Sequence, residues 1–150
     1  MVINKIWQPI SIIFILSLVI GCKGKDTSNI LIENPWGRPS PKVASAGAFY
    51  MAIKNTGSQD DALISASSPS CAVMELHESY DKGNGVMGMR EVDGGVINIP
   101  AKSQVELKMG GLHIMCIGML DEFSEGSILS ATLEFQLSGS KTIDIEIRNP

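Results

Sequence analysis

The chain has 150 residues, a length that fits one domain with a short appendage. Apolar residues make up 44% and charged residues 19%, which excludes a disordered, collagen-like or coiled-coil chain. A net charge of −4, the lack of a basic run and an aromatic content of only 5% argue against a nucleic-acid partner.

The first segment, residues 1–21, has the pattern of a secretory signal peptide. A polar start with one cation, Lys5, precedes an apolar stretch over residues 10–20. This stretch is shorter than the roughly 20 residues that a membrane-spanning helix needs. The sequence therefore predicts export from the cytoplasm.

The end of this segment resembles a bacterial lipobox, because Val19-Ile20-Gly21-Cys22 places a small residue directly before a cysteine. The resemblance implies cleavage before Cys22 and a lipid on its sulfur; the alternative is an ordinary membrane anchor with an incidental cysteine. The polar residues 22–29 would form a lipidated flexible tether, and residues 30–150 the folded domain. We expect the domain to sit at a bacterial cell envelope, lipid-anchored and facing the periplasm or the exterior.

The rest of the chain is dominated by alternation of apolar and polar residues, which is typical of strands. No stretch keeps a 3.6-residue apolar period for three turns, although residues 119–126 allow one helical turn. Glycine- and proline-containing breakers separate the candidates, and Ser138-Gly139-Ser140 supplies the last turn. Many short strands without helices between them indicate an all-β sandwich or barrel of antiparallel sheets. The expected strands cover residues 30–33, 46–55, 62–66, 73–78, 86–92, 96–99, 104–109, 112–117, 129–137 and 143–147.

Two cysteines, Cys71 and Cys116, remain after Cys22 is assigned to the lipid. Outside the cytoplasm they could form a disulfide, or each could be a small buried apolar residue. The pattern does not decide between these alternatives, and the interpretation we favour is that they are unpaired. Neither belongs to a CxxC motif, so a thioredoxin-like redox function has no support.

Histidine and methionine gather in one region of the chain. The only two histidines are His77 and His113, and six of the eight methionines lie between positions 74 and 119. His113-Ile114-Met115 places an imidazole and a thioether on one face of a strand, and Met87-Gly88-Met89 does the same with two thioethers. If these strands are neighbours, two imidazoles and two or three thioethers converge.

Such a set of ligands selects the metal. Thioether sulfur is soft and neutral, so it suits Cu(I) or Ag(I), whereas Zn(II), Mg(II) and Ca(II) prefer thiolate, imidazole or oxygen ligands. Glu75 and Glu78 flank His77 and could support it through hydrogen bonds, as carboxylates do for ligating histidines. Methionines on strands usually pack in the core. We therefore assign four methionines to the core or to loops rather than to the metal site: Met51, Met74, Met109 and Met119.

The region from Trp36 to Leu120 resembles the periplasmic copper chaperone family known as PCu(A)C. The matching text is Glu75-Leu76-His77-Glu78, then Gly85-Val86-Met87-Gly88-Met89-Arg90, then Gly110-Gly111-Leu112-His113-Ile114-Met115, with Pro35-Trp36-Gly37-Arg38 and Asn55-Thr56-Gly57 as further matches. The resemblance implies a cupredoxin-like antiparallel β-sandwich of Greek-key type, with an exposed Cu(I) site of two His and two Met. It also implies delivery of Cu(I) to the CuA centre of cytochrome c oxidase.

The spacing departs slightly from that family's pattern. Eleven residues separate His77 from Met89, one more than in the family. We assign Met89 as the ligand because the family's methionine precedes an arginine, as Met89 precedes Arg90; Met87 is the substitute. Met109 stands where the family usually has proline and could add a thioether. The chain shows no His/Met-rich tail, so we expect one metal per chain.

The predicted function is that of a Cu(I)-binding metallochaperone with His77, Met89, His113 and Met115 as ligands. Its partner would be an acceptor protein, such as a cytochrome c oxidase subunit or another copper chaperone. The sequence contains no GxSxG motif, and any catalytic triad would have to share the two histidines, so we expect no enzymatic activity. The alternatives are a copper- or silver-sequestering lipoprotein, a redox cuproenzyme, and a metal-free structural or adhesion sandwich.

Overall fold

The computed structural model describes residues 27–150 of the chain. The expected signal peptide (1–21), the expected lipidation site Cys22 and residues 23–26 of the expected tether lie outside the described residues. Within residues 27–150, no helix has the length and apolar character needed to cross a membrane.

Each strand expected from the alternation is present, with ends that shift by a few residues. The elements in chain order are β1 (Ile30–Gly37), η1 (Lys42–Ala44), β2 (Ala46–Asn55), β3 (Asp61–Ser67), β4 (Cys71–Asp81), β5 (Met87–Glu91), η2 (Asp93–Gly95), β6 (Ile97–Ile99), β7 (Ser103–Leu107), β8 (Leu112–Met119), β9 (Ile128–Phe135) and β10 (Gly139–Ile147). The two η elements are single turns of 3-10 helix.

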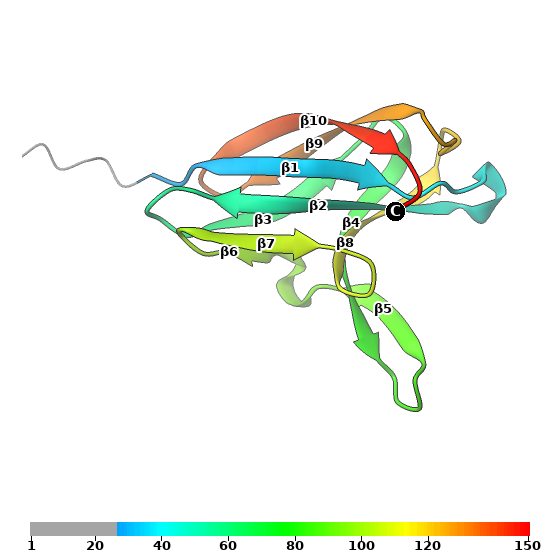
Figure 1. Cartoon of the computed structure of the whole chain (residues 1–150), viewed down its shortest axis with the longest axis horizontal. Coiled ribbons are helices and arrows are strands. Elements are labelled where there is room, and N and C mark those ends of the chain that lie inside the picture. The colour runs from blue at the N-terminus through cyan, green and yellow to red at the C-terminus, as the bar shows by residue number, and fades with distance from the viewer. Residues whose placement is uncertain (1–26) are drawn as a thin grey trace, which may run out of the picture.

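The strands hydrogen-bond in one continuous order, β5-β4-β8-β7-β2-β1-β10-β9-β3-β6, with an additional pairing between β8 and β2. The sheet curls so that β3 approaches β4, and its two halves pack face to face as in a sandwich (Figure 1). Most neighbours are antiparallel, as expected. Short parallel pairings between β1 and β10 and between β7 and β8 depart from the purely antiparallel expectation.

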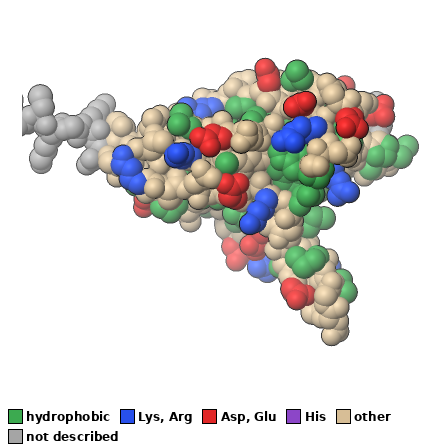
Figure 2. Space-filling model, viewed as in Figure 1, with side chains coloured by type: hydrophobic (Ala, Val, Ile, Leu, Met, Phe, Trp, Pro, Cys, Tyr) green, Lys and Arg blue, Asp and Glu red, His purple; other side chains and the backbone are tan. Residues whose placement is uncertain are grey.

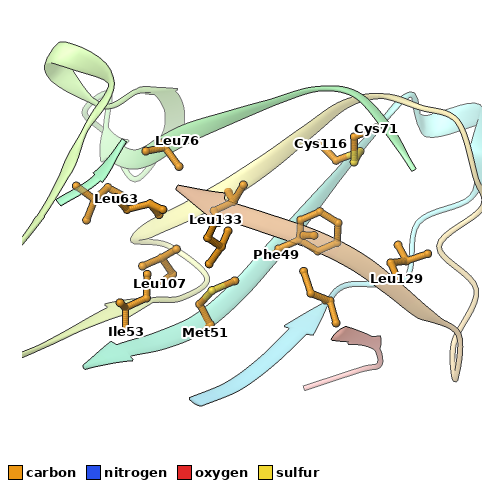
Figure 3. Packing of buried hydrophobic residues seen from close by; sticks show 14 of the residues in the cluster. Phe49, Met51, Ile53, Leu63, Cys71, Leu76, Leu107, Cys116, Leu129 and Leu133 are labelled. Atoms are coloured by element: carbon orange, nitrogen blue, oxygen red, sulfur yellow. A yellow bond between two sulfur atoms is a disulfide. The ribbon is translucent and has the colours of Figure 1, made fainter. Parts of the chain in front are cut away.

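The interior is filled by apolar side chains from the inward faces of nearly all strands. Phe49 and Met51 of β2 lie close to Leu133 of β9 in the centre of the cluster (Figure 3). Alternation explains this arrangement, because every second residue of a strand points to the same face. The outward face of β4, β5 and β8 is thereby left to the polar and sulfur-containing residues between the core positions.

Cys71 and Cys116 form a disulfide, with their Cα atoms 5.4 Å apart, so the interpretation that they are unpaired is wrong. Both side chains are buried on the core side, where β4 and β8 run next to each other (Figure 3). The pairing of these two strands brings residues 45 apart in sequence into contact. Alternation within each strand carries no information about that partnership.

The segment between β8 and β9 forms no helical turn, contrary to the expectation for residues 119–126. Phe123 instead forms a bridge to Ser40, and its ring stacks on Phe49 with centroids 5.2 Å apart. Burial of this aromatic ring holds the segment extended against the sheet.

The last hairpin turns two residues earlier than the alternation indicated, which leaves Leu137 exposed. The backbone N–H groups of Leu137 and Ser138 both donate to the carboxylate of Asp61, at 2.9 and 3.0 Å. This buried carboxylate, at the start of β3, therefore fixes where β9 ends.

Residues 27–29, which the sequence assigned to the tether, lie on the domain. The carbonyls of Thr27 and Asn29 accept hydrogen bonds from the backbone of Ser58 and Thr56, each at 2.9 Å. Buried Asn55 completes this contact, because its Oδ1 accepts from the backbone N–H of Asn29 and of Gly57. The Asn55-Thr56-Gly57 motif thus anchors the start of the domain.

Candidate metal centre

The two histidines face each other across neighbouring strands. His77 of β4 is the direct pairing partner of His113 of β8, and their ring centroids are 5.9 Å apart. His113 is only 2% exposed, so the expectation of an exposed site, which the family resemblance implied, is wrong for this residue. The ring of Tyr50, 6.3 Å away, lies beside it.

The hydrogen bond at one ring nitrogen fixes which nitrogen of His113 is open. Its Nδ1 lies 2.9 Å from the carbonyl oxygen of Gly111. A carbonyl can only accept, so Nδ1 carries the proton and Nε2 carries the lone pair. That Nε2 is buried and has no hydrogen-bond partner.

His77 has the opposite arrangement of its two nitrogens. Its Nε2 donates to Oε2 of Glu75 at 2.8 Å, and its buried Nδ1 has no hydrogen-bond partner. Glu75 and His77 are two residues apart on β4, so both project from the same face. Within the described chain, these are the two buried side-chain nitrogen or oxygen atoms left without a partner.

The electrostatics of the pair favour a neutral imidazole at His113. Burial lowers the pKa of His113, and the neighbouring His77 acts in the same direction, while the Gly111 hydrogen bond opposes them. A neutral imidazole with an open nitrogen is the form that ligates a metal.

Two of the predicted thioethers line one pocket, whose lining includes neither histidine. Met115 pairs with Glu75 across β8 and β4, on the face that carries both imidazoles. Met89 of β5 pairs with Ser79, two residues beyond His77 on that face of β4. Both methionines line a pocket of about 460 Å³ that is bordered by β2 and the loop before it.

Met87, the substitute ligand, and Met109, the candidate additional thioether, lie elsewhere. Met87 pairs with Asp81 farther out on the β4–β5 hairpin, which projects from the sandwich as an arm (Figures 1 and 2). Met109 lies in the turn between β7 and β8 and is exposed. Neither lines the pocket that Met89 and Met115 share.

Of the two carboxylates expected to support His77, only Glu75 contacts it. Glu78 lies one residue beyond His77 and therefore projects from the opposite face of β4, where it forms an ion pair with Arg90 at 2.8 Å. The expectation for Glu78 is wrong for this geometric reason. Strand alternation alone would have separated the two residues.

Among the pocket residues that sequence reasoning missed, Arg38 and Tyr50 carry the largest polar side chains. Arg38 follows β1, and Tyr50 lies on β2, whose Ala48 pairs with Met115. The Trp36-Gly37-Arg38 motif was a signal for the first residue, whereas nothing local points to Tyr50. The ring of Trp36 packs on Tyr50 with centroids 4.6 Å apart.

The four predicted ligands thus offer two open imidazole nitrogens, on His77 and His113, and two thioethers on neighbouring strand positions, Met89 and Met115. Thioethers and metal-ligating imidazoles carry no charge, and the two sulfurs are soft, which suits a soft monovalent cation better than a hard divalent one. The face shown in Figure 2 carries interspersed charges of both signs.

A family model described as "Putative lipoprotein LpqE-like" matches residues 30–147. "Putative lipoprotein Lxx21020" from Leifsonia xyli subsp. xyli is 30% identical over 128 residues, which cover 84% of this chain and 74% of that protein.

Solved structures share the fold. The apo PCuAC domain from PmoF1 matches with a TM-score of 0.69 and 23% identity, over 83% of this chain and 98% of that chain. The solution structure of CuI-DR1885 from Deinococcus radiodurans matches with a TM-score of 0.60 and 21% identity, over 86% of this chain and 83% of that chain. The all-β, sandwich-like fold inferred from the motifs is confirmed by these matches.

Proposed function

The chain belongs to the LpqE-like lipoprotein family, and from this premise we propose that it is a Cu(I)-binding metallochaperone of the cell envelope. It holds one Cu(I) ion with His77, His113, Met89 and Met115 and passes it to an acceptor protein. The ion is cargo, and the protein transfers it without catalysing a reaction.

The observation that carries this proposal is the pair of open nitrogens on His77 and His113. Buried polar atoms without a partner are rare in native structures and call for an explanation such as a bound ion. Here each imidazole uses its other nitrogen for a hydrogen bond that orients the ring, as metal-ligating histidines do. A metal ion between the two rings would satisfy both open nitrogens.

The neighbouring methionines support Cu(I) over other metals. Neutral thioethers suit Cu(I), whereas they offset little of the cost of dehydrating a dication such as Zn(II). The fold neighbour from Deinococcus radiodurans, which was solved as a Cu(I) form, gives independent support for the same metal.

The acceptor we propose is the CuA centre of cytochrome c oxidase, which the family resemblance implies. Neutral ligands beside an open pocket allow an acceptor's thiolates to replace them one at a time. Transfer is tested by mixing the Cu(I)-loaded domain with an apo CuA domain and measuring copper on each after separation. Copper that stays on this chain would favour sequestration over delivery.

Metal choice is tested by anaerobic titration of the chain with Cu(I) in the presence of a competing chelator. We expect one tight equivalent of Cu(I) and little binding of Zn(II). Equal affinity for Zn(II), or two tight equivalents of Cu(I), would contradict the proposed site.

The ligand assignment is tested with His77→Gln and His113→Gln, each of which should lower Cu(I) affinity at least about tenfold. Ile114→Ala is the control, because Ile114 is fully buried and carries no ligand. It should cost about 2–4 kcal/mol of stability through a cavity while Cu(I) affinity is retained. Unchanged Cu(I) affinity in both histidine variants would remove the basis of the proposal.

A further inference from the structure

The pocket beside Met89 and Met115 has one charged group, the guanidinium of Arg38. No acidic residue lines it, and within residues 27–150 the side chain of Arg38 forms no ion pair. The remaining lining is uncharged and comes from residues 39–40 and 46–48, from Tyr50 and from the two methionines. A cation without a counterion beside two thioethers is notable in a chain whose net charge is −4.

The other polar groups of the pocket differ in their availability. The hydroxyl of Ser40 already donates to the carbonyl of Ala46 at 3.0 Å. The hydroxyl of Tyr50 forms no hydrogen bond within the described part of the chain, so its proton is available to a ligand. Burial raises the pKa of Tyr50 and outweighs the opposing effect of the Arg38 charge, so the hydroxyl keeps its proton at neutral pH.

We propose that this pocket is where an acceptor protein removes the copper, and that Arg38 selects an acceptor cysteine with a carboxylate side chain next to it. The proposal rests on the proposed function. The guanidinium of Arg38 supplies only donors and the hydroxyl of Tyr50 can donate as well, so together they complement an anion, and an arginine can bind a carboxylate through two parallel hydrogen bonds. The acceptor's sulfur would then lie near Met89 and Met115.

The exchange leaves the oxidation state of copper unchanged. The acceptor's thiol loses its proton to water, a Cu–S bond to the thiolate forms, and one Cu–S bond to Met89 or Met115 breaks. Because the thiolate is anionic and a thioether is neutral, the exchange is favourable for Cu(I). Arg38 stabilises the approaching anionic segment before the bond forms.

The test uses three peptides, Gly-Asp-Cys-Gly, Gly-Ser-Cys-Gly and Gly-Lys-Cys-Gly, at equal thiolate concentration. Each is mixed anaerobically with the Cu(I)-loaded chain, and the rate of Cu(I) loss is followed. We expect the Asp peptide to remove copper about three to ten times faster than the Lys peptide. The negative charge of the whole chain would by itself give the reverse order.

Arg38→Gln should abolish this preference while Cu(I) is still bound. Lys54→Gln is the matched control, because it removes one positive charge from an exposed position on β2 outside the pocket. It should keep the preference. High salt should reduce the preference of the unmodified chain.

Equal rates for the three peptides, or the same preference in Arg38→Gln, would overturn the inference and leave the proposed function intact. A chain that cannot be loaded with Cu(I) at all would overturn the proposed function and this inference with it.

Discussion

Single residues decide whether the site can hold a metal. The two histidines show this, because each is oriented by a different hydrogen-bond acceptor. His113 gives its Nδ1 proton to a backbone carbonyl, whereas His77 gives its Nε2 proton to the carboxylate of Glu75. Each bond fixes one tautomer and leaves the other nitrogen with a lone pair. Because β4 and β8 pair these residues directly, the strand register determines that the two rings are neighbours.

The methionine assignment gives a prediction at the same scale. Met89 and Met87 are similarly exposed, at 60% and 56%, and lie on the same face of β5, but only Met89 lines the pocket. Met89→Ala should therefore lower Cu(I) affinity at least about tenfold, and Met87→Ala should change it little. The free energy of unfolding of both variants should lie within about 0.5 kcal/mol of that of the parent chain. Chelator competition measures the Cu(I) affinity, and thermal melts measure the stability. A larger loss of Cu(I) affinity in Met87→Ala than in Met89→Ala would make Met87 the ligand in place of Met89.

Asp61 gives a prediction about acid stability. Burial by itself would raise the pKa of Asp61, but hydrogen bonds from Ser138, Ser28, Leu137 and Ala62 outweigh it and lower the pKa from 3.8 to about 2. A carboxylate with a lowered pKa in the folded state stabilises the fold above pH 3.8, and this contribution is lost as the pH falls towards 2. It amounts to about 2 kcal/mol.

Asp61→Asn should remove that contribution, so the variant should be less stable at pH 7 and should lose less stability between pH 4 and 2. Urea denaturation across this pH range measures the difference. If the free energy of unfolding falls equally in both proteins between pH 4 and 2, the hydrogen bonds to Asp61 do not control the loss of stability in acid.

At the scale of strands, the pairing of β4 with β8 is central, because it carries both histidines, Met115 and the disulfide. Cys71 and Cys116 enclose the segment that contains the β4–β5 hairpin and all four proposed ligands. The cross-link therefore limits how far the two histidine-bearing strands, β4 and β8, can separate in the unfolded chain.

Replacing both cysteines by alanine should destabilise the domain by about 2–4 kcal/mol, because a closed loop of this length no longer restricts the unfolded state. Denaturant titration of the oxidised parent and the double variant measures the loss. A reducing agent should lower the stability of the parent and leave the double variant unchanged. Equal stability of the oxidised parent and the variant would contradict a stabilising role for the disulfide.

At the scale of the whole molecule, the two ends of the sandwich serve different purposes. β1 runs along its length, so residues 27–29 lie at one end and Arg38, at the pocket that Met89 and Met115 line, lies at the other (Figure 1). If Cys22 carries the lipid, the attachment point is at the end away from the pocket. This arrangement leaves the pocket accessible to an acceptor outside the membrane.

Anchoring is tested by Cys22→Ser, which should release the domain from membranes or leave an uncleaved precursor. The expectation follows from the lipobox-like Val19-Ile20-Gly21-Cys22, because the lipid on Cys22 would be the tether. Membrane fractionation with a size comparison measures this. A variant that is both processed and membrane-bound would contradict the lipid assignment.

The sequence by itself determined the strands and the two short motifs, His113-Ile114-Met115 and Met87-Gly88-Met89, because alternation and short spacing are local properties of a chain. It also determined that Met87 and Met89 share a face, since residues two apart on a strand always do. Only the tertiary structure decided that Cys71 pairs with Cys116, that His113 is buried, and that Arg38 and Tyr50 border the pocket. These features depend on which strands become neighbours and in which register, and that is set by packing of the whole core.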